Sequence, residues 1–109
     1  MVIVKNKHKK MMKSLKEIKE ILKKHQEEIR QKYGVKSIGI FGSFARNEQT
    51  EVSDIDIIVE FERPIGLKFF ELADYLEKIL GLKVDLLTLN ALKQKPLLWK
   101  SVREDLVYV

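Results

Sequence analysis

The sequence of 109 residues contains no cysteine, only two prolines and a single tryptophan. Without cysteine, the chain can form neither a disulfide nor a thiolate-ligated zinc site, and it has no thiol nucleophile. Its apolar runs fall short of the roughly 20 residues that cross a bilayer, and its N-terminus lacks the apolar segment of a signal peptide. These absences predict a soluble, cytoplasmic protein in which any metal ligand is oxygen or a histidine nitrogen.

The length and the hydrophobic content of 45% predict one compact domain with a single core. We therefore expect one domain over residues 1–109. It would consist of a basic N-terminal helix over about 10–33 and a core over about 36–109.

The positive charge of the chain is concentrated at its N-terminus. Residues 1–33 hold eleven Lys or Arg and four Glu, a net charge of +7, whereas the remaining residues carry −2. Such a segment can attract nucleic acid, but it is also the usual solvated face of an amphipathic helix. Because Tyr33 is its sole aromatic residue for base stacking, we favour the solvated face and keep nucleic-acid binding as the weaker alternative.

Hydrophobic periodicity predicts the order of the secondary-structure elements. Apolar residues recur at steps of three, four and seven over 10–33, which indicates a helix, and Gly34 is suited to end it. Further on, the pattern predicts strands over 36–41, 54–61 and 82–89, and either a short strand or a packed tail over 106–109. It predicts helices over 44–48, 67–80, 90–94 (capped by Asn90) and from Pro96. This order predicts an α/β (α+β) fold, a small mixed sheet with helices packed on it.

A glycine–serine turn, Gly42-Ser43, separates the strand over 36–41 from the short helix expected over 44–48. Backbone N–H groups at the start of such a helix favour anions, phosphates among them. The turn is therefore a candidate phosphate-binding element.

Three aspartates could form a metal site near this turn. Asp54 and Asp56 alternate with isoleucine, so a strand would place both on one face. Asp85 is a lone acid in an apolar strand, where an unpaired buried carboxylate would be costly, and a shared metal would explain it. Mg²⁺ prefers oxygen ligands and is commonly shared with substrate phosphates. Two such ions, about 4 Å apart, can activate a hydroxyl and stabilise leaving pyrophosphate.

The segments GSFARNEQTEVSDIDIIVEF, residues 42–61, and KVDLLT, residues 83–88, resemble the minimal nucleotidyltransferases (MNT) of the DNA polymerase beta superfamily. The resemblance implies a polymerase-beta-type nucleotidyltransferase fold and ATP as substrate. It further implies that Gly42 and Ser43 bind the nucleotide phosphates. Asp54, Asp56 and Asp85 would be the catalytic ligands of Mg²⁺, with two ions expected.

Two more residues fall within the resembling segment. Arg46 matches an arginine of the family, and either a phosphate contact or a salt bridge to Glu48 or Glu51 would explain it. Ser53 is a candidate nucleotide contact, but we favour a role in orienting the acid-bearing strand. Asn47 stands where relatives often have glycine, and asparagine tolerates the left-handed backbone better than most residues.

Short members of this family are typically encoded with a HEPN-domain protein, commonly a ribonuclease toxin, and behave as antitoxins. The resemblance implies a protein adenylyltransferase that moves AMP from ATP to a tyrosine of a cognate HEPN toxin. A non-catalytic antitoxin, which neutralises its partner by binding alone, remains the alternative.

Overall fold

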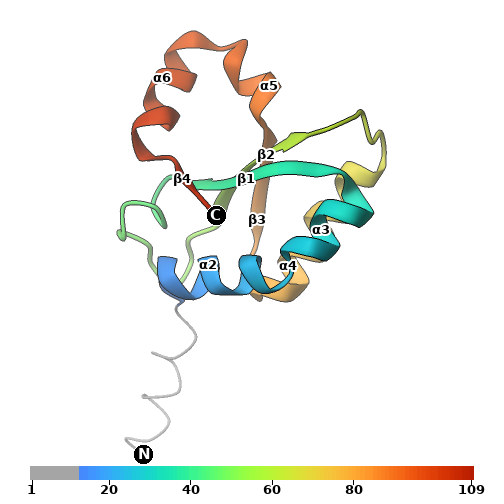
Figure 1. Ribbon diagram of the computed structural model, residues 1–109. Coiled ribbons are helices and arrows are strands. Elements are labelled where there is room, and N and C mark those ends of the chain that lie inside the picture. The colour runs from blue at the N-terminus through green and yellow to red at the C-terminus, as the bar shows by residue number, and fades with distance from the viewer. Residues whose placement is uncertain (1–12) are drawn as a thin grey trace, which may run out of the picture.

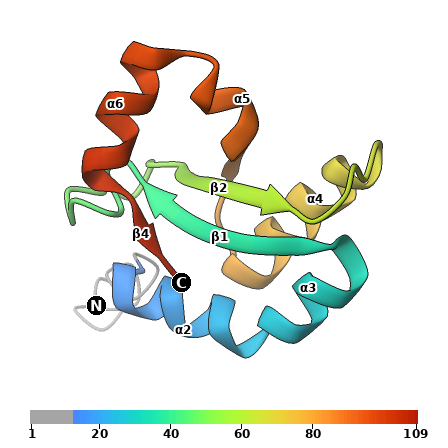
Figure 2. The ribbon, with the colours of Figure 1, turned by 45° about the horizontal axis from the view of Figure 1, so that its top comes forward.

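The computed structural model describes residues 13–109. Its centre is a four-stranded sheet in the order β3-β2-β1-β4, with helices on both faces (Figures 1 and 2). The strands are β1 (Val35–Phe41), β2 (Ile55–Phe61), β3 (Val84–Thr88) and β4 (Val107–Tyr108). The helices are α2 (Leu15–Lys24), α3 (Gln26–Tyr33), α4 (Lys68–Leu80), α5 (Leu89–Lys93) and α6 (Pro96–Asp105). The predicted mixed sheet with packed helices is confirmed.

The sheet combines antiparallel and parallel pairing. β1 runs antiparallel to both β2 and β4, whereas β2 and β3 are parallel. α4 connects the parallel pair, as a crossover between parallel strands requires. No helix in residues 13–109 is both long and apolar enough to cross a bilayer.

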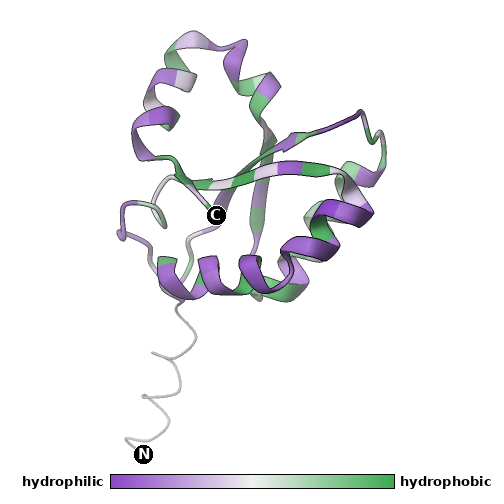
Figure 3. Ribbon diagram, viewed as in Figure 1, coloured by the Kyte–Doolittle hydropathy of each residue, from purple (hydrophilic) through white to green (hydrophobic). Residues whose placement is uncertain are grey.

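Two apolar clusters hold the helices on the sheet. The larger lies between the sheet and α2, α3 and α4, and β2 contributes Ile55, Ile57 and Val59 to it. On the opposite face, Ile58 packs with residues of α5 and α6 in a smaller cluster. Figure 3 shows the outward sides of α2 and α3 as largely hydrophilic, which matches the solvated face expected for the basic segment.

The prediction of one continuous N-terminal helix is wrong, because two helices meet at His25. Its φ of −102° and ψ of 7° interrupt the α-helical geometry, and its Nδ1 lies 2.9 Å from the carbonyl oxygen of Ile21. The spacing of apolar residues continues across the interruption, since Leu22 before it and Ile29 after it are both buried. The predicted start over residues 10–12 lies outside the described residues.

Capping residues mark the start of α2, the end of α3 and the start of α5. α2 starts with a capping box in which the Glu17 N–H donates to Ser14 Oγ (3.2 Å) and the Ser14 N–H donates to Glu17 Oε1 (3.0 Å). Gly34, with φ of 67°, ends α3 as predicted. The cap of α5 is Thr88 rather than Asn90, because Thr88 Oγ1 accepts the Ala91 N–H at 3.1 Å.

Candidate functional site

Asp56 and Asp85 lie side by side on adjacent strands. They are register partners in the parallel pairing of β2 and β3, and Asp54 immediately precedes β2, two residues before Asp56. The pKa of Asp56 is raised to about 6, and partial burial is the largest cause. The charge of Asp85, a hydrogen bond with Asp85 and the charge of Asp54 raise it further, in that order. Arg46 acts in the opposite direction. The fold thus brings the three predicted acids into one electrostatic environment.

The acids lie on an open part of the sheet. Asp54 and Asp85 are exposed and Asp56 is partly buried, so the expectation that the Asp85 carboxylate is buried is wrong. β3, which carries Asp85, is an edge strand of the sheet. Ile58, two residues beyond Asp56 on the same face of β2, is only 2% exposed under α5 and α6. The layer formed by α5 and α6 on this face of β2 therefore ends between Ile58 and Asp56.

Gly42 brings the glycine–serine turn against this acid cluster. Phe41, the last residue of β1, pairs with Asp56, and Gly42 follows with φ of 75°. A Cβ atom at position 42 would overlap the carboxylate of Asp56. The backbone conformation therefore favours glycine, and any side chain at this position would force the Asp56 carboxylate to move.

The residues after Gly42 form consecutive turns, so the prediction of a short helix over 44–48 is wrong. The Arg46 N–H donates to the Gly42 carbonyl (3.1 Å), and the Glu48 N–H donates to the Ser43 carbonyl (2.8 Å). Asn47 adopts a φ of 61°, the left-handed conformation in which a helix cannot continue. This agrees with the expectation that asparagine suits the position.

The turn leaves backbone donors available for an anion. Within residues 13–109, the N–H groups of Ser43, Phe44 and Ala45 have no hydrogen-bond acceptor. The Phe44 side chain is only 1% exposed and anchors the turn in the main core. Successive unpaired N–H groups on an anchored turn are a suitable cradle for phosphate oxygens.

Arg46 forms ion pairs instead of pointing freely to solvent. Its Nε donates to Glu48 Oε1 at 2.9 Å, and its Nη1 donates to Asp105 Oδ2 at 2.5 Å. The hydrogen bond with Glu48, and then that with Asp105, raises the pKa of Arg46. The salt bridge to Glu48 was one of the two sequence-based interpretations. Asp105 was missed, because it is distant in sequence and belongs to no recognised motif.

Ser53 organises the loop before β2. Its Oγ accepts the Thr50 N–H at 2.9 Å and lies 3.2 Å from Thr50 Oγ1. These contacts hold the loop together, and the roles of Ser53 in orienting the strand or contacting the nucleotide stay predictions.

The nucleotidyltransferase domain family matches residues 15–109, which include the turn and all three acids. The chain belongs to this family. A Methanocaldococcus jannaschii protein named as a putative protein adenylyltransferase is 62% identical over 99 residues, covering 90% of this chain and 100% of the relative. The protein adenylyltransferase MntA of Thermococcus cleftensis is 48% identical over 99 residues, covering 90% of this chain and 98% of the relative.

Two solved structures have a similar fold. A toxin–antitoxin structure with AMP-PNP matches with a TM-score of 0.64 at 27% identity, covering 84% of this chain and 70% of that one. The structure of a tri-AMPylated Shewanella oneidensis HEPN toxin in complex with an MNT antitoxin matches with a TM-score of 0.60 at 24% identity. That match again covers 84% of this chain and 70% of the other, and it supports the fold alone.

The acids of this nucleotidyltransferase domain have suitable chemistry for Mg²⁺. In the part of the chain from residue 13 to 109, no three acidic or histidine side chains are already arranged around one metal position. Asp56 and Asp85 nevertheless offer adjacent carboxylate oxygens. The pKa of Asp56 is raised first by partial burial and then by repulsion from Asp85, and a bound cation would offset both. Donors of this kind fit an ion whose remaining ligands come from nucleotide phosphates and water.

A separate cleft of about 510 Å³ lies at the other ends of β2 and β3. It is lined in part by Glu60, Arg63, Asn90 and Lys93, none of which belongs to the acid cluster. The candidate site of this nucleotidyltransferase domain is thus an exposed surface beside the turn and not the cleft.

Proposed function

We propose that this protein is a Mg²⁺-dependent adenylyltransferase that moves AMP from ATP to a tyrosine of a cognate HEPN-domain toxin and thereby acts as an antitoxin. The observation that carries the proposal is the position of Asp56. Its carboxylate adjoins both Asp85 on the neighbouring strand and the Cα of Gly42. Phosphate-binding N–H groups and metal-binding oxygens therefore meet at one point.

The chain's own groups have distinct roles in this reaction. The N–H groups of residues 43–45 bind phosphate oxygens of ATP and orient the α-phosphorus toward the acids. Asp54, Asp56 and Asp85 hold Mg²⁺, which when bound supplies charge neutralisation and favours deprotonation of the attacking hydroxyl. Asp85, which is exposed beside Asp56, accepts the proton of that hydroxyl. The hydroxyl oxygen forms a bond to the α-phosphorus, and the bond to pyrophosphate breaks.

The open surface supports a protein as the acceptor. Asp54 and Asp85 are both exposed, so a side chain carried by another folded protein can reach them. The names of two relatives, both protein adenylyltransferases, and a structural neighbour described as a toxin–antitoxin support the same acceptor class. The choice of a HEPN toxin and of its tyrosine follows from the family resemblance.

Labelled ATP tests this proposal directly. The protein is incubated with α-labelled ATP, Mg²⁺ and the cognate HEPN-domain protein of the proposal, and label on the HEPN protein is measured. We expect label that is lost with a chelator, with the Asp54→Asn/Asp56→Asn double variant, and with phenylalanine in place of the acceptor tyrosine. Equal labelling by the double variant would falsify the catalytic assignment. GTP and CTP, labelled in the same way, determine the nucleotide preference.

A binding antitoxin without catalysis is the second candidate. It requires only a surface that contacts the toxin, and the presence of all three acids, Asp54, Asp56 and Asp85, counts against it. The same double variant separates the two functions in cells that express the toxin. Loss of neutralisation with retained binding to the toxin supports catalysis, whereas full neutralisation by the variant supports inhibition by contact.

A further inference from the structure

Arg46 connects the phosphate-binding turn to the far end of the chain. Its Nη1 donates to Asp105 Oδ2 at 2.5 Å, across a separation of 59 residues. Asp105 is the last residue of α6 and is followed shortly by β4, which pairs with β1 at Gly39 and Ile40. The ion pair therefore ties the turn to a part of the fold that is itself fixed to the sheet.

The charges around Arg46 indicate a positional role. Its guanidinium meets two carboxylates, Glu48 and Asp105, so its positive charge is already compensated before any phosphate arrives. Asp105 also stands at the C-terminus of a helix, where the helix dipole disfavours an acid. A carboxylate at this position is stabilised by the guanidinium, and the side chain of Asp105 is only 25% exposed.

The backbone of the same residues closes the turn. The Arg46 N–H donates to the Gly42 carbonyl, and the N–H of Glu48 donates to the Ser43 carbonyl. Arg46 and Glu48 therefore shape the turn through their backbone N–H groups as well as through the ion pair of their side chains. A chain of contacts leads from Asp105 through Arg46 to Gly42, which adjoins Asp56.

We infer that Asp105 is a positioning residue for the nucleotide: by holding Arg46, it fixes the N–H groups of residues 43–45 in their phosphate-binding arrangement before the nucleotide binds. This inference deepens the proposed function and rests on it for the nature of the ligand. Asp105 touches neither the nucleotide nor the reacting atoms. By ordering the turn in advance, Asp105 lowers the conformational entropy that nucleotide binding costs, and it thereby raises nucleotide affinity.

Asp105→Asn tests the inference, because it removes the charge and keeps the shape. We expect the KM for ATP and the Kd for AMP-PNP to rise about fivefold, in line with the loss of a partly exposed ion pair, while kcat changes little. Asp105→Glu should restore most of the affinity. Amide hydrogen exchange of residues 43–48 in the nucleotide-free protein should be faster in Asp105→Asn than in the wild type.

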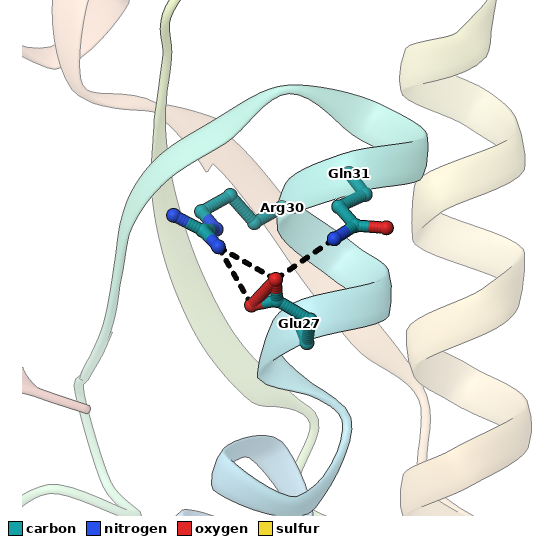
Figure 4. Close-up of polar contacts among 3 residues, drawn as sticks. All are labelled: Glu27, Arg30 and Gln31. Atoms are coloured by element: carbon teal, nitrogen blue, oxygen red, sulfur yellow. Dashed lines mark hydrogen bonds and ion pairs between the residues drawn. The ribbon is translucent and has the colours of Figure 1, made fainter.

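The matched control is a pair of the same kind away from the site. Glu27 and Arg30 on α3 are joined at 2.6 Å, with a further hydrogen bond from Gln31 to Glu27 (Figure 4). Glu27→Gln removes a surface ion pair remote from the turn and should leave KM, Kd and exchange of the turn unchanged. Glu48→Gln, which removes the second carboxylate from Arg46, should also weaken nucleotide binding.

Several outcomes would overturn the inference. They are equal nucleotide affinity in Asp105→Asn and Glu27→Gln, no rescue by Asp105→Glu, a fall in kcat at constant KM, or no binding of AMP-PNP by the wild-type protein. Binding is measured without an acceptor, so the inference and the proposed function can fail separately. If Asp105→Asn weakens AMP-PNP binding but no AMP reaches the HEPN protein, the positioning role stands and the proposed acceptor is wrong.

Discussion

Asp56 and Asp85 are direct register partners across two parallel strands, and this proximity helps to raise the pKa of Asp56 to about 6. The folded protein therefore favours the protonated form of Asp56, whose ordinary pKa is 3.8. The stability associated with that proton is fully present below about pH 4 and is lost as the pH rises through about 6. An aspartate whose ionised form destabilises the folded state is typical of a functional site.

We expect Asp56→Asn to raise the stability of the metal-free protein at pH 8, because the amide carries no charge to desolvate or repel. The gain should shrink as the pH is lowered through about 6 and vanish well below pH 3.8, where Asp56 is protonated in both the folded and the unfolded state. Urea unfolding at several pH values in the presence of a chelator measures it. Asp74→Asn, at an exposed position on α4 away from the three acids, serves as the control for removing a carboxylate. An Asp56→Asn variant that is less stable than the wild type at pH 8 would contradict the destabilising effect assigned to the ionised Asp56 carboxylate.

Mg²⁺ should reverse the order of stability between the two proteins. The wild type gains stability with Mg²⁺ and AMP-PNP together, because ligands that bind the folded state alone shift the unfolding equilibrium. Asp56→Asn lacks one of the proposed ligands and should gain much less. The Tm measured with and without Mg²⁺, at constant AMP-PNP, provides the comparison. Ca²⁺ is a useful second ion, since it tolerates larger and less regular oxygen coordination than Mg²⁺.

Local sequence signals predicted those features of the fold that depend on neighbouring residues. The strand alternation around Asp56, the left-handed glycine Gly34 after α3 and the helix start at Pro96 all appear in the structure. Each depends on backbone preferences within one or two turns of chain. The acids could likewise be recognised, because Asp54 and Asp56 lie in a strand pattern with period two.

The remaining features depend on tertiary contacts that no local pattern contains. The interruption at His25 keeps the same apolar step between Leu22 and Ile29 as an unbroken helix, so periodicity could not reveal it. The pairing of Arg46 with Asp105 joins elements 59 residues apart. The exposure of Asp85 follows from where the cover of α5 and α6 ends, and an apolar sequence around it wrongly indicated burial.

The capping box at the start of α2 should contribute measurably to stability. Ser14→Ala removes the acceptor of the Glu17 N–H and should lower the free energy of unfolding by about 1 kcal/mol. Ser101→Ala is the matched control, because Ser101 is exposed within α6, where alanine is the better helix former. Chemical denaturation of both variants measures the effect. A Ser14→Ala variant as stable as Ser101→Ala would show that the cap contributes nothing.

Gly42 offers the sharpest test of the geometry of the site, because Gly66 provides a control with a similar backbone. Gly42 has φ of 75° and Gly66 has φ of 57°, so alanine should incur a similar strain of about 1–2 kcal/mol at either position. A Cβ at Gly42 would overlap the carboxylate of Asp56, whereas a Cβ at Gly66 would meet no atom within 4 Å. Only Gly42→Ala therefore displaces Asp56 or the turn beside it.

We expect Gly66→Ala to be less stable than the wild type but to bind AMP-PNP and transfer AMP normally. Gly42→Ala should lose more stability and should bind AMP-PNP and Mg²⁺ at least tenfold more weakly, since one good charge-assisted contact corresponds to about 1.5–3 kcal/mol. Unfolding free energy and nucleotide affinity, measured side by side, separate backbone strain from the overlap. If the two variants lose affinity equally, the close approach of Gly42 to Asp56 has no part in nucleotide binding, and the turn and the acids act independently.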